Sequence, residues 1–382
     1  MSVEHQEIDP RDTTTETARP TAADLDPWTR LLYRGSVVGD LALRTGLATV
    51  VSSTVLPGTV LGRTGHDRDD LAFYAGYARA RDASRVFRRP PRTVVSVEPG
   101  RDHGLSGERV ELLTFDSGYE TLNPDFRAAY DGHRANRTAH AQHWRHESGP
   151  RPTLVVVHGF GASPASFNTA FFSLRQFFAD GWDILLYTLP FHGSRRERWL
   201  PLNGLGLFSH GMPHLCEAVI HAIHDLQILL DHLEERGAPR VGVTGLSLGG
   251  YISALLAEVD PRLDFAIPNA AVTWMPGLFD SWFPANLTVR LGRSVAGVTA
   301  AELADALAVH SPLTYAPVIP HERLMVIGGL GDRLAPPEQS LMLWEHWGRP
   351  ALHWFPGNHV LHLGRNDYLD SMRRLMAVGR AD

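Results

Sequence analysis

Lysine is absent from this 382-residue sequence, so all 36 basic residues are arginine. Chemistry that depends on a lysine amine is therefore excluded: no Schiff base can form on the chain, and no P-loop lysine can reach a nucleotide phosphate. Cysteine is almost absent as well, since Cys216 is the only one. The sequence predicts no intrachain disulfide, no cysteine-based metal cluster and a location in the reducing cytoplasm.

The sequence also lacks an excess of positive charge and a long hydrophobic run. Its 36 basic and 42 acidic groups give a formal net charge of -6, so we expect no nucleic-acid partner. Residues 45–62 carry no charge, but they contain Ser, Thr, Gly and Pro, whereas a spanning helix needs about 20 predominantly apolar residues. We expect a buried helix broken at Pro57 and no integral membrane span. Residues 1–26 lack the apolar core of a secretory signal, which predicts a disordered tail.

Two kinds of pattern divide the remaining chain. Residues 27–92 place apolar side chains at helical spacings and end in a proline-rich breaker, which predicts a helical N-terminal extension. From residue 93 to 382, short β-branched runs alternate with helical segments, the clearest of which spans residues 212–236. This alternation predicts an α/β domain with a mostly parallel sheet flanked by helices. The predicted strands are residues 93–97, 109–115, 153–157, 184–187, 240–244, 265–267, 324–327 and 352–355.

The segment Gly245-Leu246-Ser247-Leu248-Gly249 has the G-x-S-x-G spacing of a nucleophile elbow. A predicted strand precedes it and a predicted helix follows it, as the elbow requires. Glycines are needed on both sides because the serine sits on a sharp turn where Cβ atoms would collide with neighbouring backbone. Ser247 is therefore the candidate nucleophile. The alternative is a glycine-rich strand-to-helix turn with no catalytic role.

A second backbone-exposing loop follows the predicted strand at residues 153–157, where the sequence reads His158-Gly159-Phe160-Gly161. Such a loop can offer a backbone amide, here that of Phe160. Paired with the amide of Leu248, at the positive end of the next helix, it would form an oxyanion hole.

An acid and a base follow two later strands. Asp332 lies in the glycine-rich loop after residues 324–327, and His359 lies in the loop after residues 352–355. These loops would meet at the carboxyl edge of the sheet, where an aspartate can orient a histidine. An Asx-turn is the other interpretation of Asp332, and Asp280 is the alternative acid.

On these motifs, taken in the order Ser, Asp, His, residues 93–382 resemble the α/β-hydrolase family. The resemblance implies an eight-stranded sheet, a Ser247-Asp332-His359 triad, and acyl transfer through an acyl-enzyme without a cofactor or metal. Serine at the nucleophile position argues against epoxide hydrolases and dehalogenases, which carry aspartate there. The first 92 residues fall outside the resemblance.

An insertion at about residues 271–318 falls where relatives carry a lid, and it is rich in large apolar residues. Its Trp274, Trp282 and Phe283, together with His158, are candidate substrate-binding residues; alternatively, the aromatic residues only pack the insertion onto the core. Arg195 and Arg196 could pair with a substrate carboxylate, but we expect them on a solvated face.

The leading hypothesis is a serine hydrolase that acts on a small carboxylic ester. The same triad would serve an amide, thioester or carbon-carbon bond hydrolase. From a different class, a ligand-binding module with a slow triad remains open.

Overall fold

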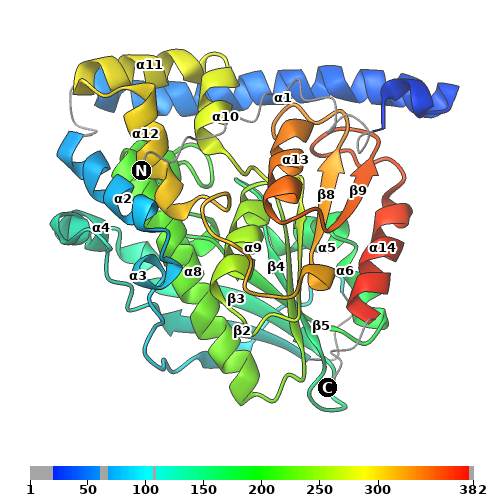
Figure 1. The fold of residues 1–382 in the computed structure, drawn as a ribbon. Helices are drawn as coiled ribbons and strands as arrows, with labels where there is room; N and C mark the ends of the chain where they lie inside the picture. Colours follow the sequence, from blue (N-terminus) through cyan, green and yellow to red (C-terminus); the bar gives the residue numbers. More distant parts are fainter. Residues whose placement is uncertain (1–19, 61–67, 106–108, 378–382) are drawn as a thin grey trace.

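The computed structural model describes residues 20–60, 68–105 and 109–377, apart from the side chains of residues 57–60. Most of the tail expected over residues 1–26 lies outside this part of the chain; within it, Ala22–Asp24 form the short helix η2. The described residues form one sheet of nine strands, in the order β1-β2-β3-β5-β4-β6-β7-β8-β9 (Figure 1). The strands are β1 (Ser96–Pro99), β2 (Arg109–Asp116), β3 (Thr138–Arg145), β4 (Thr153–Val157), β5 (Asp183–Thr188), β6 (Val241–Leu246), β7 (Phe265–Asn269), β8 (Met325–Gly329) and β9 (Ala351–Phe355).

The parallel part of the sheet runs from β5 to β9 and is covered on both faces. Every residue of β4, β6, β7 and β8 is buried, as expected of central parallel strands. Alternate residues of β4 face opposite cores: Val155 packs in the cluster of α8 (Met212–Glu235) and α9 (Leu248–Val259). Val156 packs in the cluster of α5 (Ala165–Phe171), α6 (Leu174–Ala179) and α14 (Arg365–Ala377). The chain therefore has the predicted α/β-hydrolase fold.

β3 is the strand that the sequence pattern did not predict, so the sheet has nine strands where eight were expected. Its Ala139 and Ala141 are fully buried, whereas His140 and Gln142 alternate with them at half-buried positions. The strand pairs antiparallel with β2 on one side and with β5 on the other. In its first half the apolar side chains are only alanines between polar residues, and the large apolar Trp144 comes next to its end, so the sequence shows no β-branched run there.

The N-terminal extension contains, within the described residues, the helices α1 (Pro27–Val60), α2 (Arg68–Ala80) and α3 (Ala83–Val86). Tyr74 of α2 donates a hydrogen bond to Glu217 of α8 at 2.6 Å. α1 lies along one edge of the molecule (Figure 1), and it corrects the expectation of a buried helix broken at Pro57. It continues to Val60, and of residues 45–56 only Ala48 and Ser52 are buried, while Leu56 is 38% exposed. No helix in the described ranges is long and apolar enough to cross a membrane.

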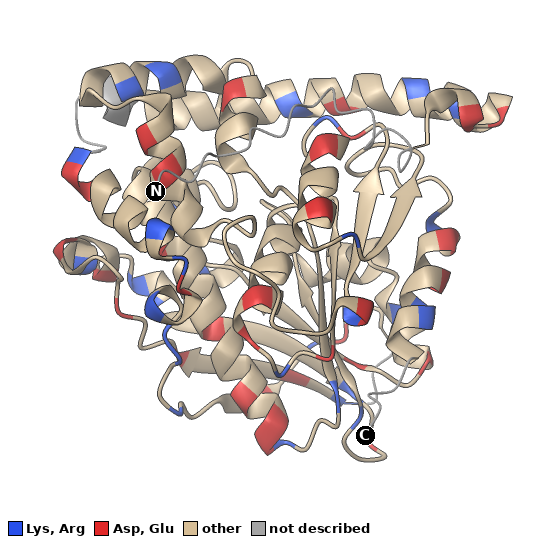
Figure 2. Ribbon diagram, in the orientation of Figure 1, with Lys and Arg blue, Asp and Glu red and all other residues tan. Residues whose placement is uncertain are grey.

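Between β7 and β8 the insertion forms three helices, α10 (Met275–Ser281), α11 (Ala285–Ala296) and α12 (Ala300–Leu307). α11 lies beside α1 (Figure 1). Figure 2 shows acidic and basic residues interspersed along the outer helices in this view, without a face of one sign. The remaining helices are η3 (Pro124–Phe126), α4 (Arg127–Asp131), η4 (Arg134–Asn136), η5 (Gly193–Arg195), α7 (Gly206–Ser209), η6 (Ala308–His310), η7 (His321–Arg323) and α13 (Pro337–His346).

Candidate active site

Ser247 stands at a strained turn between β6 and α9. Its φ of 58° and ψ of -114° lie in a region that residues with a Cβ rarely adopt. The two glycines of the motif are sterically required: a Cβ on Gly245 would approach Gly249 O to 2.3 Å, and one on Gly249 would approach Val157 O to 2.0 Å. The helix can therefore begin directly against the end of β4, and this holds the partly exposed serine at the carboxyl edge of the sheet.

Asp332 and His359 form a buried pair at the same edge of the sheet, after β8 and β9. Asp332 Oδ2 and His359 Nδ1 are 2.6 Å apart. The other carboxylate oxygen accepts the backbone amides of Leu334 and Ala335 at 2.9 and 2.7 Å. Because Nδ1 is held by the aspartate, Nε2 is the nitrogen left to act as a base. In the part of the chain that the structure describes, His359 and Ser247 are not hydrogen-bonded to each other.

Electrostatics at His359 favour the protonated imidazole. Burial opposes the charge of the ring, but the neighbouring Asp332, through its charge and its hydrogen bond, and the charge of Asp40 outweigh it. Together they raise the pKa of His359 above its ordinary value of 6.5. A base with a raised pKa binds the nucleophile's proton more strongly once it is transferred.

Asp40 belongs to α1 and was not anticipated from the sequence. It is 1% exposed, and its Oδ2 accepts the backbone amide of Arg333 at 2.5 Å, one residue beyond the acid. Its Oδ1 is buried without a hydrogen-bond partner among the described residues, and burial raises the pKa of this carboxyl. A lone carboxylate within an apolar helical segment was the available signal.

α1 contacts the loop of the base as well as the loop of the acid. Asn358, next to the base, donates from Nδ2 to the carbonyl of Ser36 at 2.7 Å. On the other loop, Gly331 approaches the side chains of Tyr33 and Val37 closely. One helix of the extension therefore holds both loops that supply the acid-base pair.

The candidate oxyanion loop, residues 159–163, makes a tight turn in which the amide of Ala162 donates to Gly159 O at 3.1 Å. Leu248 is the first residue of α9, so its amide has no partner within the helix. His158, expected to bind substrate, is instead fully buried. Its Nδ1 bonds to Gly159 O at 2.8 Å and its Nε2 accepts the amide of Leu189 at 3.2 Å. Both ring nitrogens bond to backbone groups, so His158 stabilises the loop rather than lining a pocket.

Comparison with known proteins identifies the family of this chain. A family model described as the alpha/beta hydrolase family matches residues 154–375. The chain belongs to the alpha/beta hydrolase family. Two uncharacterized proteins of Mycobacterium tuberculosis, from strains CDC 1551 / Oshkosh and ATCC 25618 / H37Rv, are each 30% identical to it over 302 residues, covering 76% of this chain and 69% of theirs. Family membership supports a hydrolase.

Two solved structures of similar fold are acetyl xylan esterases. The enzyme from Paenibacillus sp. R4 has a TM-score of 0.56 at 17% identity, over 82% of this chain and 96% of its own. Acetyl Xylan Esterase 1 from Thermoanaerobacterium sp. JW/SL YS485 has a TM-score of 0.57 at 15% identity, over 80% and 94%. At these identities the likeness concerns the fold.

In this alpha/beta hydrolase the aromatic residues of the insertion have different surroundings. Trp282 is partly buried and donates from Nε1 to Leu334 O, beside the acid, at 3.2 Å. Trp274 and Phe283 are 43% and 59% exposed. The alternative acid, Asp280, is an exposed residue of α10.

A row of three phenylalanines was missed. Phe160 of the oxyanion loop lies 5.3 Å from Phe208 of α7, ring centre to ring centre, and Phe208 lies 6.3 Å from Phe279 of α10. The row joins the oxyanion loop to the insertion. Only the tertiary structure brings these three residues together, because they come from separate segments of the chain.

Arg195 corrects a further expectation, since it is fully buried instead of solvated, whereas its neighbour Arg196 is exposed as expected. Its guanidinium pairs with Asp225 of α8 at 2.7 Å and donates to Tyr187 of β5 and to Asn136 O. The loop after β5 is therefore anchored to the core behind it.

Proposed function

We propose that this alpha/beta hydrolase cleaves carboxylic esters, with Ser247 as nucleophile, His359 as general base and Asp332 as the residue that orients it. The observation that carries the proposal is the juxtaposition of two features at one edge of the sheet. One is a strained serine between two glycines that tolerate no Cβ, and the other is a buried aspartate-histidine pair. A structural turn needs neither the strain nor the pair.

The chemistry has two halves. Ser247 Oγ attacks the ester carbonyl while His359 Nε2 takes its proton, and the amides of Phe160 and Leu248 stabilise the oxyanion. The imidazolium then returns the proton to the departing alcohol, which leaves an acyl-enzyme. Water attacks the acyl group in the same way, with His359 again accepting a proton, and releases the carboxylic acid and free Ser247.

For the acyl group we propose an apolar pocket bounded by Phe160, Phe208 and Phe279, with the more exposed Trp274 and Phe283 at its rim. The row of rings begins at the oxyanion loop, so an acyl chain held by that loop would meet it. Two proteins of similar fold are named as acetyl xylan esterases, which is compatible with a short acyl group.

The test is covalent labelling with a fluorophosphonate probe, read by intact mass. Wild type should gain one label and should hydrolyse p-nitrophenyl esters with an acyl burst. Ser247→Ala should lose the label and at least about ten-thousandfold in kcat. Ser281→Ala, which removes an exposed serine of α10, is the matched control and should behave as wild type.

A folded wild-type protein that takes no label would overturn the proposal. Ser247 and His359 are not hydrogen-bonded in this structure, and catalytic hydrogen bonds often tighten only when a substrate is bound. Labelling therefore tests directly whether the two residues act together. Binding of an ester without turnover would then favour the ligand-binding module. Equal rates on esters and matched amides or thioesters would reject the ester preference.

A further inference from the structure

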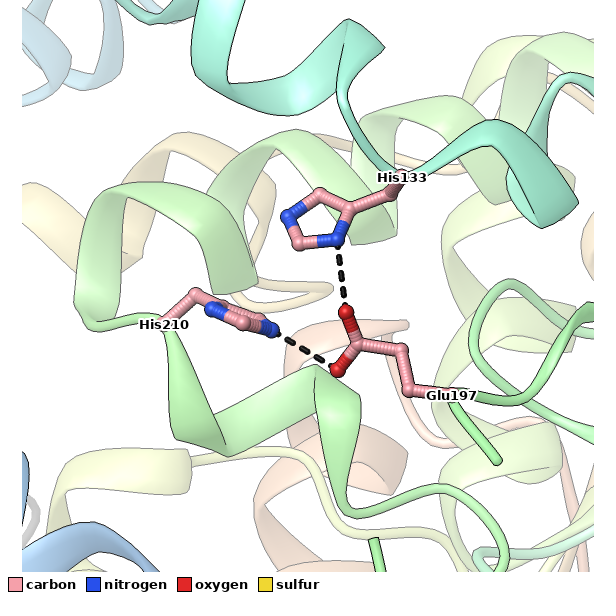
Figure 3. Close-up of side chains that lie close together, drawn as sticks. All are labelled: His133, Glu197 and His210. Atoms are coloured by element: carbon pink, nitrogen blue, oxygen red, sulfur yellow. Dashed lines mark hydrogen bonds and ion pairs between the residues drawn. The ribbon is translucent and has the colours of Figure 1, made fainter. Parts of the chain in front are cut away.

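Away from the catalytic residues, two histidines and a glutamate from three segments point their ligand atoms at one another (Figure 3). His133 lies between α4 and η4, Glu197 follows η5, and His210 follows α7. His133 Nδ1 is 2.7 Å from Glu197 Oε1, and His210 Nε2 is 2.8 Å from Glu197 Oε2. The three ligand atoms lie within 4.8 Å of one another.

A fourth histidine lies beside the cluster. His214, in the first turn of α8, has its ring centre 5.6 Å from that of His210 and 5.7 Å from that of His133. It is 8% exposed, and its Nδ1 is buried without a hydrogen-bond partner in the described part of the chain. His214 therefore packs against the cluster, but its ring nitrogens do not lie within 4.8 Å of all three ligand atoms, so it is not counted as a ligand.

We propose that His133, Glu197 and His210 bind a divalent cation of the zinc class, with solvent at the remaining coordination position. Imidazole nitrogens and a carboxylate oxygen suit such an ion. Ligand atoms at about 2.1 Å from a tetrahedral ion lie about 3.4 Å apart. His133 and His210 now contact different oxygens of Glu197, at 2.7 and 2.8 Å, so a carboxylate that binds the ion through both oxygens needs each contact to widen by only a fraction of an ångström as the ion replaces the shared protons.

The surroundings allow an ion to enter. The side chains of His133, Glu197 and His210 are 11%, 13% and 23% exposed, so the cluster is shielded without being sealed. His133 also lines an open cavity of about 220 Å³. The cluster therefore has an approach from solvent, which a site loaded after folding requires.

The ion would hold the segment between β5 and α8 in place. Between the ligands Glu197 and His210, this segment contacts the oxyanion loop: Asn203 Nδ2 donates to Gly161 O at 3.0 Å and to Ser163 Oγ at 2.7 Å, and Phe208 packs on Phe160. A metal bound to Glu197, His210 and His133 would fix both ends of the segment, and the segment would in turn hold the oxyanion loop in place. This structural role rests on the proposed function; metal binding itself does not.

The test uses tag-free full-length protein, stripped with a chelator and titrated with Co²⁺ and Zn²⁺. We expect one Co²⁺ per chain with the visible d–d absorption of a tetrahedral complex, displacement by one Zn²⁺, and a higher melting temperature with Zn²⁺. His210→Asn and Glu197→Gln should weaken binding by more than about tenfold, the loss typical of removing even an outer-sphere partner. His321→Asn, at an exposed histidine elsewhere, should bind as wild type.

Two results would overturn the site. One is folded wild type that gives no Co²⁺ spectrum, which would leave the cluster as a metal-free histidine-glutamate ion pair. The other is binding that His210→Asn and Glu197→Gln leave unchanged, which would place the ion on other histidines. Ser247→Ala should bind the metal as wild type does, so failure of the metal site and failure of the esterase are read independently.

Discussion

At the scale of single residues, Asp40 gives the sharpest prediction. The proposed mechanism requires neutral His359, and Asp332 and Asp40 raise the pKa of that imidazole against the effect of burial. The acid limb of kcat/KM should therefore lie above pH 6.5, the ordinary value for histidine. Asp40→Asn removes one source of negative potential, so the acid limb should move to lower pH while the plateau is largely retained.

The measurement is the pH profile of kcat/KM on a p-nitrophenyl ester for wild type, Asp40→Asn and the control Asp280→Asn. Asp280 is exposed on α10, so its substitution should leave the profile unchanged. An acid limb that stays in place in Asp40→Asn would show that the carboxyl acts only as a partner for the amide of Arg333. A loss of activity without a shift would have the same meaning.

A second prediction contrasts two glycines. Gly249→Ala should destabilise the fold by about 3 kcal/mol or more, because the new Cβ would meet Val157 O at 2.0 Å and backbone cannot move aside cheaply. Gly76 lies on the exposed side of α2, and a Cβ added there would have nothing within 4 Å. Gly76→Ala should stabilise by up to about 1 kcal/mol. Urea unfolding checks both, and equal midpoints would refute the steric account of the elbow.

Sequence reasoning could place residues whose position is set by local patterns, and it missed residues whose surroundings are set by tertiary contacts. The elbow around Ser247 and the positions of Asp332 and His359 follow from strand, turn and glycine patterns within a few residues. Asp40 gains its surroundings only when a helix almost three hundred residues earlier in the chain packs on the acid loop. The cluster of His133, Glu197 and His210 likewise has no short-range spacing that predicts it.

At the scale of secondary structure elements, periodicity succeeded for the central strands and failed at the periphery. Continuous apolar runs such as β4 are unmistakable because both faces of the sheet are covered. β3 was not predicted because it has no β-branched run: its buried positions are two alanines, His143 and Trp144, among polar residues. The break expected at Pro57 did not occur, since α1 continues to Val60.

The insertion carries a prediction at this scale. Phe279 of α10 belongs to the row of rings that starts at the oxyanion loop, whereas Phe283 is 59% exposed. Phe279→Ala should therefore change the ratio of kcat/KM between p-nitrophenyl acetate and longer esters more than Phe283→Ala does. The melting temperatures of the two variants are compared, so that a change in ester preference can be told apart from a loss of stability. Equal ratios in both variants would mean that the aromatic residues only pack the insertion on the core.

At the scale of the whole molecule, α1 ties together parts that the sheet alone leaves separate. It contacts the acid loop through Asp40, the base loop through Ser36 O, and the insertion through α11. Yet the two buried clusters on the faces of the sheet begin, within the described residues, only at Leu71. The helix is therefore placed to order the catalytic loops without being part of the main core.

Truncation separates these two roles. A chain that begins at residue 27 loses the carbonyl oxygens to which Arg30 donates near the surface, and should keep both its melting temperature and its activity. A chain that begins at residue 68 should keep the far-ultraviolet circular dichroism of the sheet and its helices. Its kcat/KM should fall about a hundredfold, because the loops of Asp332 and His359 lose the helix that positions them. Full activity in the shorter chain would show that these loops hold their geometry unaided, and an unfolded shorter chain would show that α1 is needed by the core itself.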